Sequence, residues 1–433
     1  MTRPHQPALS RRTLLGSTAV AGVGAVLASG TAAAADSDRR RNPIDQAAVD
    51  AVATRLDGSL VALRRELHAN PQTTGQETFA SAAVAGRLRA AGLSVESVAG
   101  TGVVAVLKGA RPGRTVAYRA DMDAVPGPGI MPPVADRPAA HACGHDIHTT
   151  VGVGVAQVLA QLRQRLSGSV VFLFQPGEEG LVGAQAMLDA KVLTRHGVEE
   201  IHALHCGPYP VGQFAVTPGS GLPGQDYAAV TLSGPDALAA AGRLAAEIGR
   251  LGTVALPQSP ADLERMVADV QTPDGPLARF LVTQARPAKV PDAEGRVAVD
   301  VKFRCWPEER TPGIREEIRR IAQSYGGVVA FPKPAFPALV CPVEETDALA
   351  RHLRRVLGRG GVTVNHTAYP FNGEDYALFL REVPGTYTFL GVRTPGAGIE
   401  TSYPHYETFV PDERAIGVGV RAMAGWLAAR SHC

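Results

Sequence analysis

The chain has 433 residues, of which 45% are apolar and 19% charged, and its formal net charge at pH 7 is +2. These values are ordinary for a globular protein and exclude a largely disordered chain. No basic stripe with interleaved aromatic residues is present, so nucleic acid is not an expected partner. The length exceeds what one hydrophobic core usually organises and therefore favours two domains.

The first 35 residues predict an export signal rather than a part of the fold. Residues 10–15 read Ser-Arg-Arg-Thr-Leu-Leu and open a Gly- and Ala-rich apolar stretch that ends at residues 32–35. This pattern is typical of a twin-arginine signal, so we expect export to the cell envelope or the outside. The apolar run at 13–28 is shorter than the ~20 residues of a spanning helix. No stable membrane span is therefore expected once the signal is removed.

Helical and strand patterns alternate after the signal. Apolar residues recur at helical spacing over 44–68, and a second helical pattern at 77–91 is closed by Gly92. The following patterns predict strands and further helices up to residue 205: strands at 103–107, 115–118, 170–174 and 201–205, and helices at 149–166 and 184–193. This alternation predicts an α/β fold whose mostly parallel sheet is covered by helices on both faces.

Near residue 225 the pattern changes and predicts an inserted, smaller α+β unit. Its expected elements are strands at 227–232 and 297–304 and helices at 237–251 and 314–325, separated by proline-bearing segments. The chain then returns to the larger unit and ends with a strand at 387–390 and a helix at 412–429. The predicted domains are therefore the signal at 1–35, a larger domain built from 44–224 and 332–433, and an inserted lid at 225–331.

Residues 141–148 read His-Ala-Cys-Gly-His-Asp-Ile-His and predict a metal site. Thiolate, imidazole and carboxylate are the usual ligands of zinc-like ions. Cys143 and His145 are two residues apart, so in an extended segment both side chains would leave the same face and reach one ion. The alternative is a buried free cysteine beside a solvated histidine. The five cysteines are an odd number without repeated short spacing, so no disulfide framework is expected.

Other polar runs follow the predicted strands and would share the carboxyl edge of the sheet, where ligand groups gather in α/β folds. These runs are 119–123, 175–180, 203–205, 372–375 and 404–405. Alone, each is a weak signal. A lone histidine such as His205 is more often a core or surface residue, and Glu374-Asp375 is typical of a helix N-terminal turn.

In order and together, these motifs resemble those of the M20 family of metallopeptidases and amidohydrolases. The resemblance is to the branch of N-acyl-amino-acid amidohydrolases that includes hippurate hydrolases and auxin-conjugate hydrolases. The motifs that carry it are Arg-Arg-Glu-Leu-His at 64–68, Arg-Ala-Asp-Met-Asp-Ala at 119–124, the 141–148 motif, Phe-Gln-Pro-Gly-Glu-Glu at 174–179, Ala-Leu-His at 203–205 and Glu-Asp-Tyr at 374–376. It extends over residues 55–220 and 365–425.

The resemblance implies a hydrolase that cleaves the amide bond of N-acyl amino acids, related small amides or short peptides with metal-activated water. It implies two divalent metal ions per subunit, zinc or manganese first, with cobalt or nickel as alternatives. Glu178 takes the place of the general base. Asp123 and Asp146 are expected behind the ligands, orienting imidazoles. The implied metal ligands are Cys143, His145, Glu179, His205 and His405.

Four further histidines are given no ligand role. His141 and His148 lie within the metal motif but have no assigned function, whereas His68 and His202 are expected to be structural. A nucleophilic cysteine enzyme is the competing chemistry, because Cys143 is flanked by histidines. No Gly-x-Ser-x-Gly motif is present for a serine enzyme. A nucleophilic mechanism would leave the acid pair at 178–179 without a function, so metal-dependent hydrolysis is preferred.

The chain departs from the family pattern in the lid. The family's lid histidine, which is thought to reach a partner subunit's site and stabilise the oxyanion, is missing, since no histidine occurs between His205 and His352. Arg304 keeps the position of a family arginine. Loss of one oxyanion donor can cost about 10²–10³ in rate. The second hypothesis is therefore a diverged metal-binding relative that binds a ligand with weak or no hydrolysis. A homodimer formed through the lid is also suggested by the resemblance.

Overall fold

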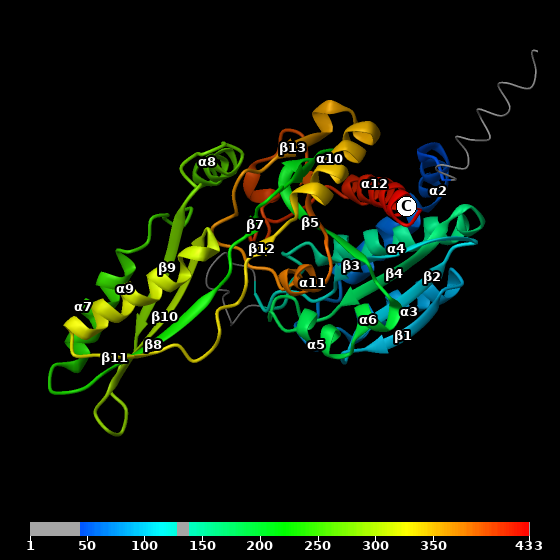
Figure 1. Cartoon of the computed structure of the whole chain (residues 1–433). Helices are drawn as coiled ribbons and strands as arrows, with labels where there is room; N and C mark the ends of the chain where they lie inside the picture. The colour runs from blue at the N-terminus through cyan, green and yellow to red at the C-terminus, as the bar shows by residue number, and fades with distance from the viewer. Residues whose placement is uncertain (1–43, 128–137, 433) are drawn as a thin grey trace, which may run out of the picture. The chain divides into compact units, whose positions relative to one another are not determined.

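The computed structural model describes residues 44–127 and 138–432 (Figure 1). The predicted export signal lies outside the described residues and stays a prediction. Within the described ranges, no helix combines the length and the apolar character needed to cross a membrane.

The larger of the two main sheets has eight strands in the order β1-β2-β4-β3-β5-β14-β6-β13. Its central strands β4, β3, β5 and β14 are parallel, whereas β1 and β2 form an antiparallel edge. The expected mostly parallel sheet is thus confirmed at its centre. The strands span Ser94–Val98 (β1), Gly102–Lys108 (β2), Arg111–Asp121 (β3), Ser167–Gln175 (β4), Glu200–Pro210 (β5), Phe214–Val216 (β6), Val362–Val364 (β13) and Gly385–Arg393 (β14).

Helices cover both faces of this sheet because successive strand residues point to opposite sides. In β4, Val170 and Phe172 belong to one hydrophobic core, and Val171 and Leu173 belong to the other. The first core is completed by α2 (Gln46–His68), α3 (Thr78–Ala90), α4 (His145–Gln161), α10 (Val343–Leu357) and α12 (Arg414–Arg430). The second is completed by α5 (Gly183–Asp189), α6 (Val192–His196), α8 (Pro260–Val270) and α11 (Tyr376–Glu382).

A four-stranded antiparallel sheet in the order β11-β8-β10-β9 lies within the interval predicted for the lid. Its strands are Asp226–Leu232 (β8), Phe280–Pro287 (β9), Val297–Trp306 (β10) and Val328–Ala330 (β11). Helices α7 (Ala237–Gly249) and α9 (Thr311–Ser324) pack on one face of this sheet and form a third core with it. We call residues 225–331 the lid. The division into domains, like a lid-mediated homodimer, stays a prediction. A two-stranded sheet pairs β7 (Gly221–Leu222) with β12 (Leu339–Val340).

Two helices lie where the sequence analysis assigns none. Pro260 belongs to a proline-bearing segment between predicted elements, and it occupies the first turn of α8, where proline loses no hydrogen bond. The side chain of Ser259 caps this helix by accepting a hydrogen bond from the Asp262 amide. Helix α10 begins directly after Pro342. In both cases proline marks the beginning of a helix.

Gly154 allows α4 to lie close against α2 and α12. A β-carbon at this position would lie 2.5 Å from Val420 Cγ2 and 2.8 Å from Leu60 Cδ1. We expect Gly154→Ala to lower the free energy of unfolding by about 1–3 kcal/mol, because the added methyl group overpacks the core. Urea-induced unfolding, followed by circular dichroism, measures this change.

Gly242 in α7 is the matched control. A β-carbon there would meet no atom within 4 Å. Gly242→Ala should therefore raise the free energy of unfolding by about 0.4–1 kcal/mol, since alanine has less backbone freedom to lose on folding. Changes of the same sign in both variants would contradict the packing argument.

Candidate active site and metal centre

Cys143, His145 and Glu179 form a cluster of possible metal ligands beyond the carboxyl ends of the central strands. One ligand atom of each lies within 4.8 Å of the others. Cys143 and His145 are buried, and Glu179 is half-buried. We call these three residues the donor cluster. It combines sulfur, nitrogen and oxygen from segments that are about 35 positions apart in the chain.

The backbone between Cys143 and His145 is not extended, so the predicted local geometry is wrong. Gly144 has a φ of 93° and forms the N-cap of α4, which begins at His145. This left-handed conformation favours glycine. A β-carbon at Gly144 would also lie 2.7 Å from Cys206 Sγ. The two predicted ligands therefore meet through a tight glycine turn.

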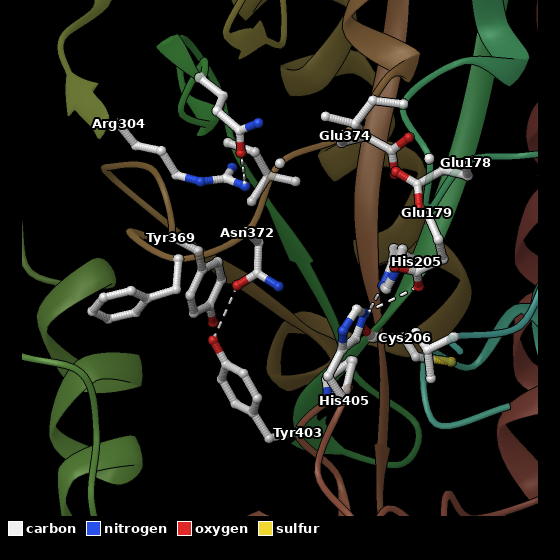
Figure 2. A pocket seen from close by; sticks show the side chains of 18 of the residues that line it. Glu178, Glu179, His205, Cys206, Arg304, Tyr369, Asn372, Glu374, Tyr403 and His405 are labelled. Carbon is white, nitrogen blue, oxygen red and sulfur yellow. Dashed lines mark hydrogen bonds and ion pairs between the residues drawn. The ribbon is translucent and has the colours of Figure 1, made fainter. Parts of the chain in front are cut away.

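His205 and His405 lie next to the donor cluster, as Figure 2 shows for Glu179 and these two histidines. His405 Nε2 is 3.1 Å from Glu179 Oε1, and the rings of His205 and His145 have centroids 5.7 Å apart. His405 has a φ of 72°, which is uncommon for a residue other than glycine and occurs often at functional sites. The five predicted ligands thus gather in one place, although their role as ligands stays a prediction.

The ring nitrogens of the predicted ligands His145 and His205 are arranged as in metal sites. His145 Nδ1 is 2.8 Å from the Asp123 carbonyl oxygen, and His205 Nδ1 is 2.9 Å from the Cys206 carbonyl oxygen. Each Nδ1–H can therefore donate to the backbone, which leaves the lone pair on Nε2. Histidines that bind metals commonly donate their other ring N–H in this way.

In the part of the chain that the structure describes, the buried His145 Nε2 has no hydrogen-bond partner, and the buried Glu179 Oε1 has only its ion pair with His405. Such atoms cost free energy unless something satisfies them. A cation would satisfy both, and sulfur, nitrogen and oxygen donors suit a zinc-like ion. The residues present therefore fit a bound metal.

The pKa of His205 fits a cation site, whereas that of Cys143 favours the protonated thiol until a metal binds. Burial lowers the pKa of His205 well below its ordinary value, so this ring stays neutral and keeps a lone pair for a cation. Burial raises the pKa of the Cys143 thiol to about 12. Because the thiolate is the ligand form, metal binding at Cys143 would release a proton.

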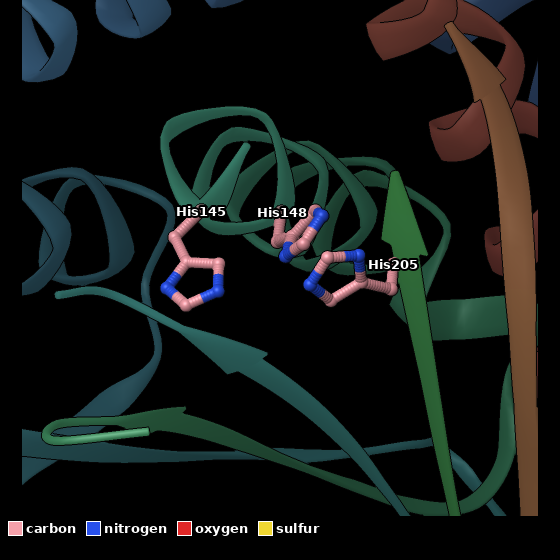
Figure 3. Close-up of side chains that lie close together, drawn as sticks. All are labelled: His145, His148 and His205. Carbon is pink, nitrogen blue, oxygen red and sulfur yellow. The ribbon is translucent and has the colours of Figure 1, made fainter. Parts of the chain in front are cut away.

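His148 lies beside His145 and His205 but has both ring nitrogens occupied (Figure 3). Its Nδ1 is 2.6 Å from Asp121 Oδ1, and its Nε2 accepts a hydrogen bond of 2.7 Å from the Cys206 amide. An Nε2 that accepts requires the proton on Nδ1, which then donates to Asp121. His148 therefore has no free lone pair for a cation in this arrangement, and it fixes the backbone next to His205.

The two aspartates expected behind the ligands have different contacts. The Asp123 carboxylate accepts hydrogen bonds from Thr74 Oγ1 at 2.8 Å and from the amides of Glu178 and Glu179 at 3.1 and 3.0 Å. Both its carbonyl oxygen, at 2.8 Å, and its carboxylate Oδ1, at 3.4 Å, lie near His145 Nδ1. Asp123 thus binds both the turn that carries Glu178 and Glu179 and the ring of the predicted ligand His145.

Asp146 contacts the helix α2 instead of a ligand imidazole. Its Oδ2 lies 2.8 Å from His68 Nδ1 and 2.9 Å from Arg64 Nε. These contacts join the 64–68 motif to the metal motif and give His68 the structural role that the sequence analysis assigns to it. Asp121, to which the sequence analysis gives no role, contacts His148 of the metal motif at 2.6 Å.

Glu178 is buried on the other side of the turn, with ligand atoms within 4.8 Å of Glu374 and Asp375. Its Oε2 is also 3.8 Å from His145 Nε2. Burial, together with the neighbouring Glu374 and Glu179, raises the pKa of Glu178 well above its ordinary value. Glu178 therefore lies with Glu374 and Asp375, whereas Glu179 lies in the donor cluster. The two side chains diverge as expected, but their backbone is a turn instead of the expected extended loop.

A cavity of about 340 Å³ connects these acids with the lid. Glu178, Glu179, His205 and His405 form one side of it. Aromatic residues form much of the remaining wall, and the opposite side belongs to the lid. The aromatic residues are Tyr369, Phe371, Tyr387, Phe389 and Tyr403, and the lid residues are Gln225, Tyr227, Lys302 and Arg304.

Arg304 points into this cavity from β10, as Figure 2 shows. Its Nη2 donates a hydrogen bond of 2.6 Å to Gln225 Oε1, whereas its buried Nε and Nη1 have no partner among the described residues. Burial lowers the pKa of Arg304 to about 10, so the guanidinium stays cationic at neutral pH. A β-carbon at Gly373 would lie 2.4 Å from Nη1. The absence of a side chain there makes room for the guanidinium.

The family model described as Peptidase family M20/M25/M40 matches residues 117–429. The chain belongs to this family. This M20 chain is 30% identical over 389 residues to thermostable carboxypeptidase 2 of Saccharolobus solfataricus. The alignment covers 85% of this chain and 94% of that protein. It is also 30% identical over 390 residues to N-acetylcysteine deacetylase of Bacillus subtilis. This alignment covers 84% of this chain and 95% of the deacetylase.

A solved structure described as a dinuclear metal binding peptidase of the M20 family, from Bacillus subtilis, has the same fold. It matches this M20 chain with a TM-score of 0.67 and 28% sequence identity over 88% of this chain and 98% of that one. These comparisons confirm the predicted family, the α/β fold class and a hydrolase of amide or peptide bonds. The substrate and the identity of the metal stay predictions.

The donor cluster predicts that Cys143 is needed for metal binding. We expect about two divalent ions per chain in the natural protein. Cys143→Ala should lower metal affinity by about 10-fold or more, because the cluster loses its thiolate. Elemental analysis after dialysis against a weak chelator measures the bound metal.

Cys341→Ala is the control. Cys341 is also buried, but its sulfur accepts a hydrogen bond from Thr217 and it lies outside the donor cluster. This variant should retain the metal content of the natural protein. Equal metal contents in the two variants would refute a ligand role for Cys143.

Proposed function

We propose that this M20 hydrolase is a metal-dependent amidohydrolase that cleaves the amide bond of N-acyl amino acids or related small amides and short peptides. The observation that carries the proposal is the position of Glu178. Its buried carboxylate lines the cavity, lies 3.8 Å from His145 Nε2 and is adjacent in the chain to a member of the donor cluster. A proton acceptor therefore stands beside the place where a metal would be held.

Divalent cations, when bound, lower the pKa of a water molecule and polarise the scissile carbonyl. Glu178 accepts a proton from the attacking water and delivers it to the amide nitrogen, so that the C–N bond breaks and an acid and an amine leave. Its raised pKa suits a group that both takes up and releases a proton. Asp123 keeps the carboxylate in place by binding the amides of Glu178 and Glu179.

The lid side of the cavity supports a substrate that carries a carboxylate. Arg304 presents a buried guanidinium with two unpartnered nitrogens, and guanidinium binds carboxylate with paired, charge-assisted hydrogen bonds. The aromatic wall offers apolar surface for an acyl group. The relative named N-acetylcysteine deacetylase also supports an N-acyl amino acid as the substrate.

A second candidate, ligand binding with weak or no turnover, is favoured by one observation. No histidine occurs between His205 and His352, so the lid offers no imidazole to stabilise an oxyanion. In this candidate function the donor cluster and Arg304 would hold a carboxylate ligand without cleaving it.

A substrate panel separates the two candidates. We expect the metal-loaded protein to hydrolyse N-acetyl, N-benzoyl or longer N-acyl amino acids, with dipeptides as the comparison. The corresponding amides, in which the α-carboxylate is replaced, should react about 10-fold more slowly or worse, because Arg304 loses its charged partner. Liberated amine is quantified by a colorimetric assay. No turnover of any compound by the metal-loaded protein would favour ligand binding.

Glu178→Gln tests the proton-transfer role. The variant should lose about 10²–10⁴ in kcat, because an amide cannot accept the proton, while its metal content stays that of the natural protein. Glu382→Gln, an exposed change at the end of α11, is the control and should leave kcat unchanged. Undiminished turnover by the Glu178 variant would refute its role as the base.

A further inference from the structure

A second cation, Lys302, precedes Arg304 by two positions on β10. Alternate residues of this strand are buried against α7 and α9, and the residues between them face the other side of the sheet. Along that other side, exposure falls from the exposed Asp300 through the half-buried Lys302 to the buried Arg304. The sheet therefore enters the cavity at these last two positions, and both cations line it.

The ammonium group of Lys302 lacks an acidic partner. No ion pair or hydrogen bond joins it to any residue in 44–127 or 138–432. The ring of Tyr227, its partner in register on β8, lies 5.9 Å away, and its partner on β9 is Gln284. Burial and the like charges of Arg304 and Arg286 lower the pKa of Lys302 to about 8. This is the behaviour of a cation that is held beside other cations without an anion.

The acids near this face do not neutralise Lys302. Asp226 on β8 binds Arg315 through both carboxylate oxygens, at 2.6 and 2.9 Å. Asp300 lies on the exposed part of the strand, opposite Arg286 in register. The lid wall of the cavity thus presents two cations in a row, and neither forms an ion pair with an acid among the described residues.

We propose that Lys302 is a specificity-determining residue that binds the side-chain carboxylate of an acidic amino acid in the substrate. The inference rests on the proposed function, in which Arg304 binds the α-carboxylate of an N-acyl amino acid. Positions two apart on a strand are separated by about 7 Å, so long side chains from them can bind the two carboxylates of one aspartate or glutamate. Lys302 is the less buried of the two and takes the group farther from the scissile bond.

The test compares acidic substrates with their neutral isosteres. With the metal-loaded full chain, kcat/KM for N-acetylaspartate and N-acetylglutamate should exceed that for N-acetylasparagine and N-acetylglutamine by about 10-fold or more. In Lys302→Met this ratio should fall to near 1, and in Lys302→Arg the preference should persist because the charge is kept. Lys289→Met, an exposed change elsewhere in the lid, is the matched control and should keep the ratio.

Two results would overturn the inference while leaving the proposed function intact: a natural protein that hydrolyses neutral and acidic substrates equally well, or a preference that survives in Lys302→Met. If no N-acyl amino acid is hydrolysed, the proposed function fails. The role of Lys302 is then tested separately by measuring ligand binding. Calorimetry on metal-loaded Glu178→Gln should then show N-acetylglutamate binding about 10-fold more tightly than N-acetylglutamine. Equal dissociation constants would overturn the role of Lys302.

Discussion

Arg119 is buried among three carboxylates, and the geometry of the site depends on this cluster. Its guanidinium donates to Asp121 at 2.5 Å, to Glu374 at 2.7 Å and to Asp375 at 3.2 Å, and it also binds Gln175. Removing one partner from a buried ion cluster typically costs about 3–5 kcal/mol, because the remaining charges stay buried without compensation. The end of β3 is thereby fixed to a segment 255 positions further along the chain.

Hydrogen bonds extend from this cluster to both parts of the site. Asp121 binds His148, and His148 accepts the amide hydrogen of Cys206, so the backbone beside His205 is held through two hydrogen bonds from the ion cluster. Glu374 is bound by Arg119 and by the Tyr387 hydroxyl, which keeps its carboxylate close to Glu178. The ion cluster therefore orders the backbone beside a predicted ligand, and its member Glu374, together with burial, raises the pKa of the predicted base.

The sequence was sufficient for the fold class and for which residues gather, because residue type and strand order bring Cys143 and His145 to the sheet edge that also holds Glu179. The sequence was insufficient to predict contacts between residues that are far apart in the chain. Glu374 does bind the amide of Tyr376 at the start of α11, as its position before a helix predicts, but its bond to Arg119 joins distant segments. Likewise, Gly144 in its left-handed turn packs so closely against Cys206 that no side chain fits, a contact that no sequence spacing shows.

The charges on the two sides of the cavity dictate how a substrate would lie in it. Glu178 and Glu374, which lie outside the donor cluster, line the side of the large sheet, whereas Lys302 and Arg304 line the lid side, so an anionic substrate group is attracted to the lid. An N-acyl amino acid would place its carboxylate at the lid and its amide near Glu178. Cleavage then turns the amide nitrogen into an amine, which gains a positive charge facing the acids, while the carboxylate stays with the cations. The same separation of charge that orients the substrate would therefore also stabilise the amino-acid product as it forms.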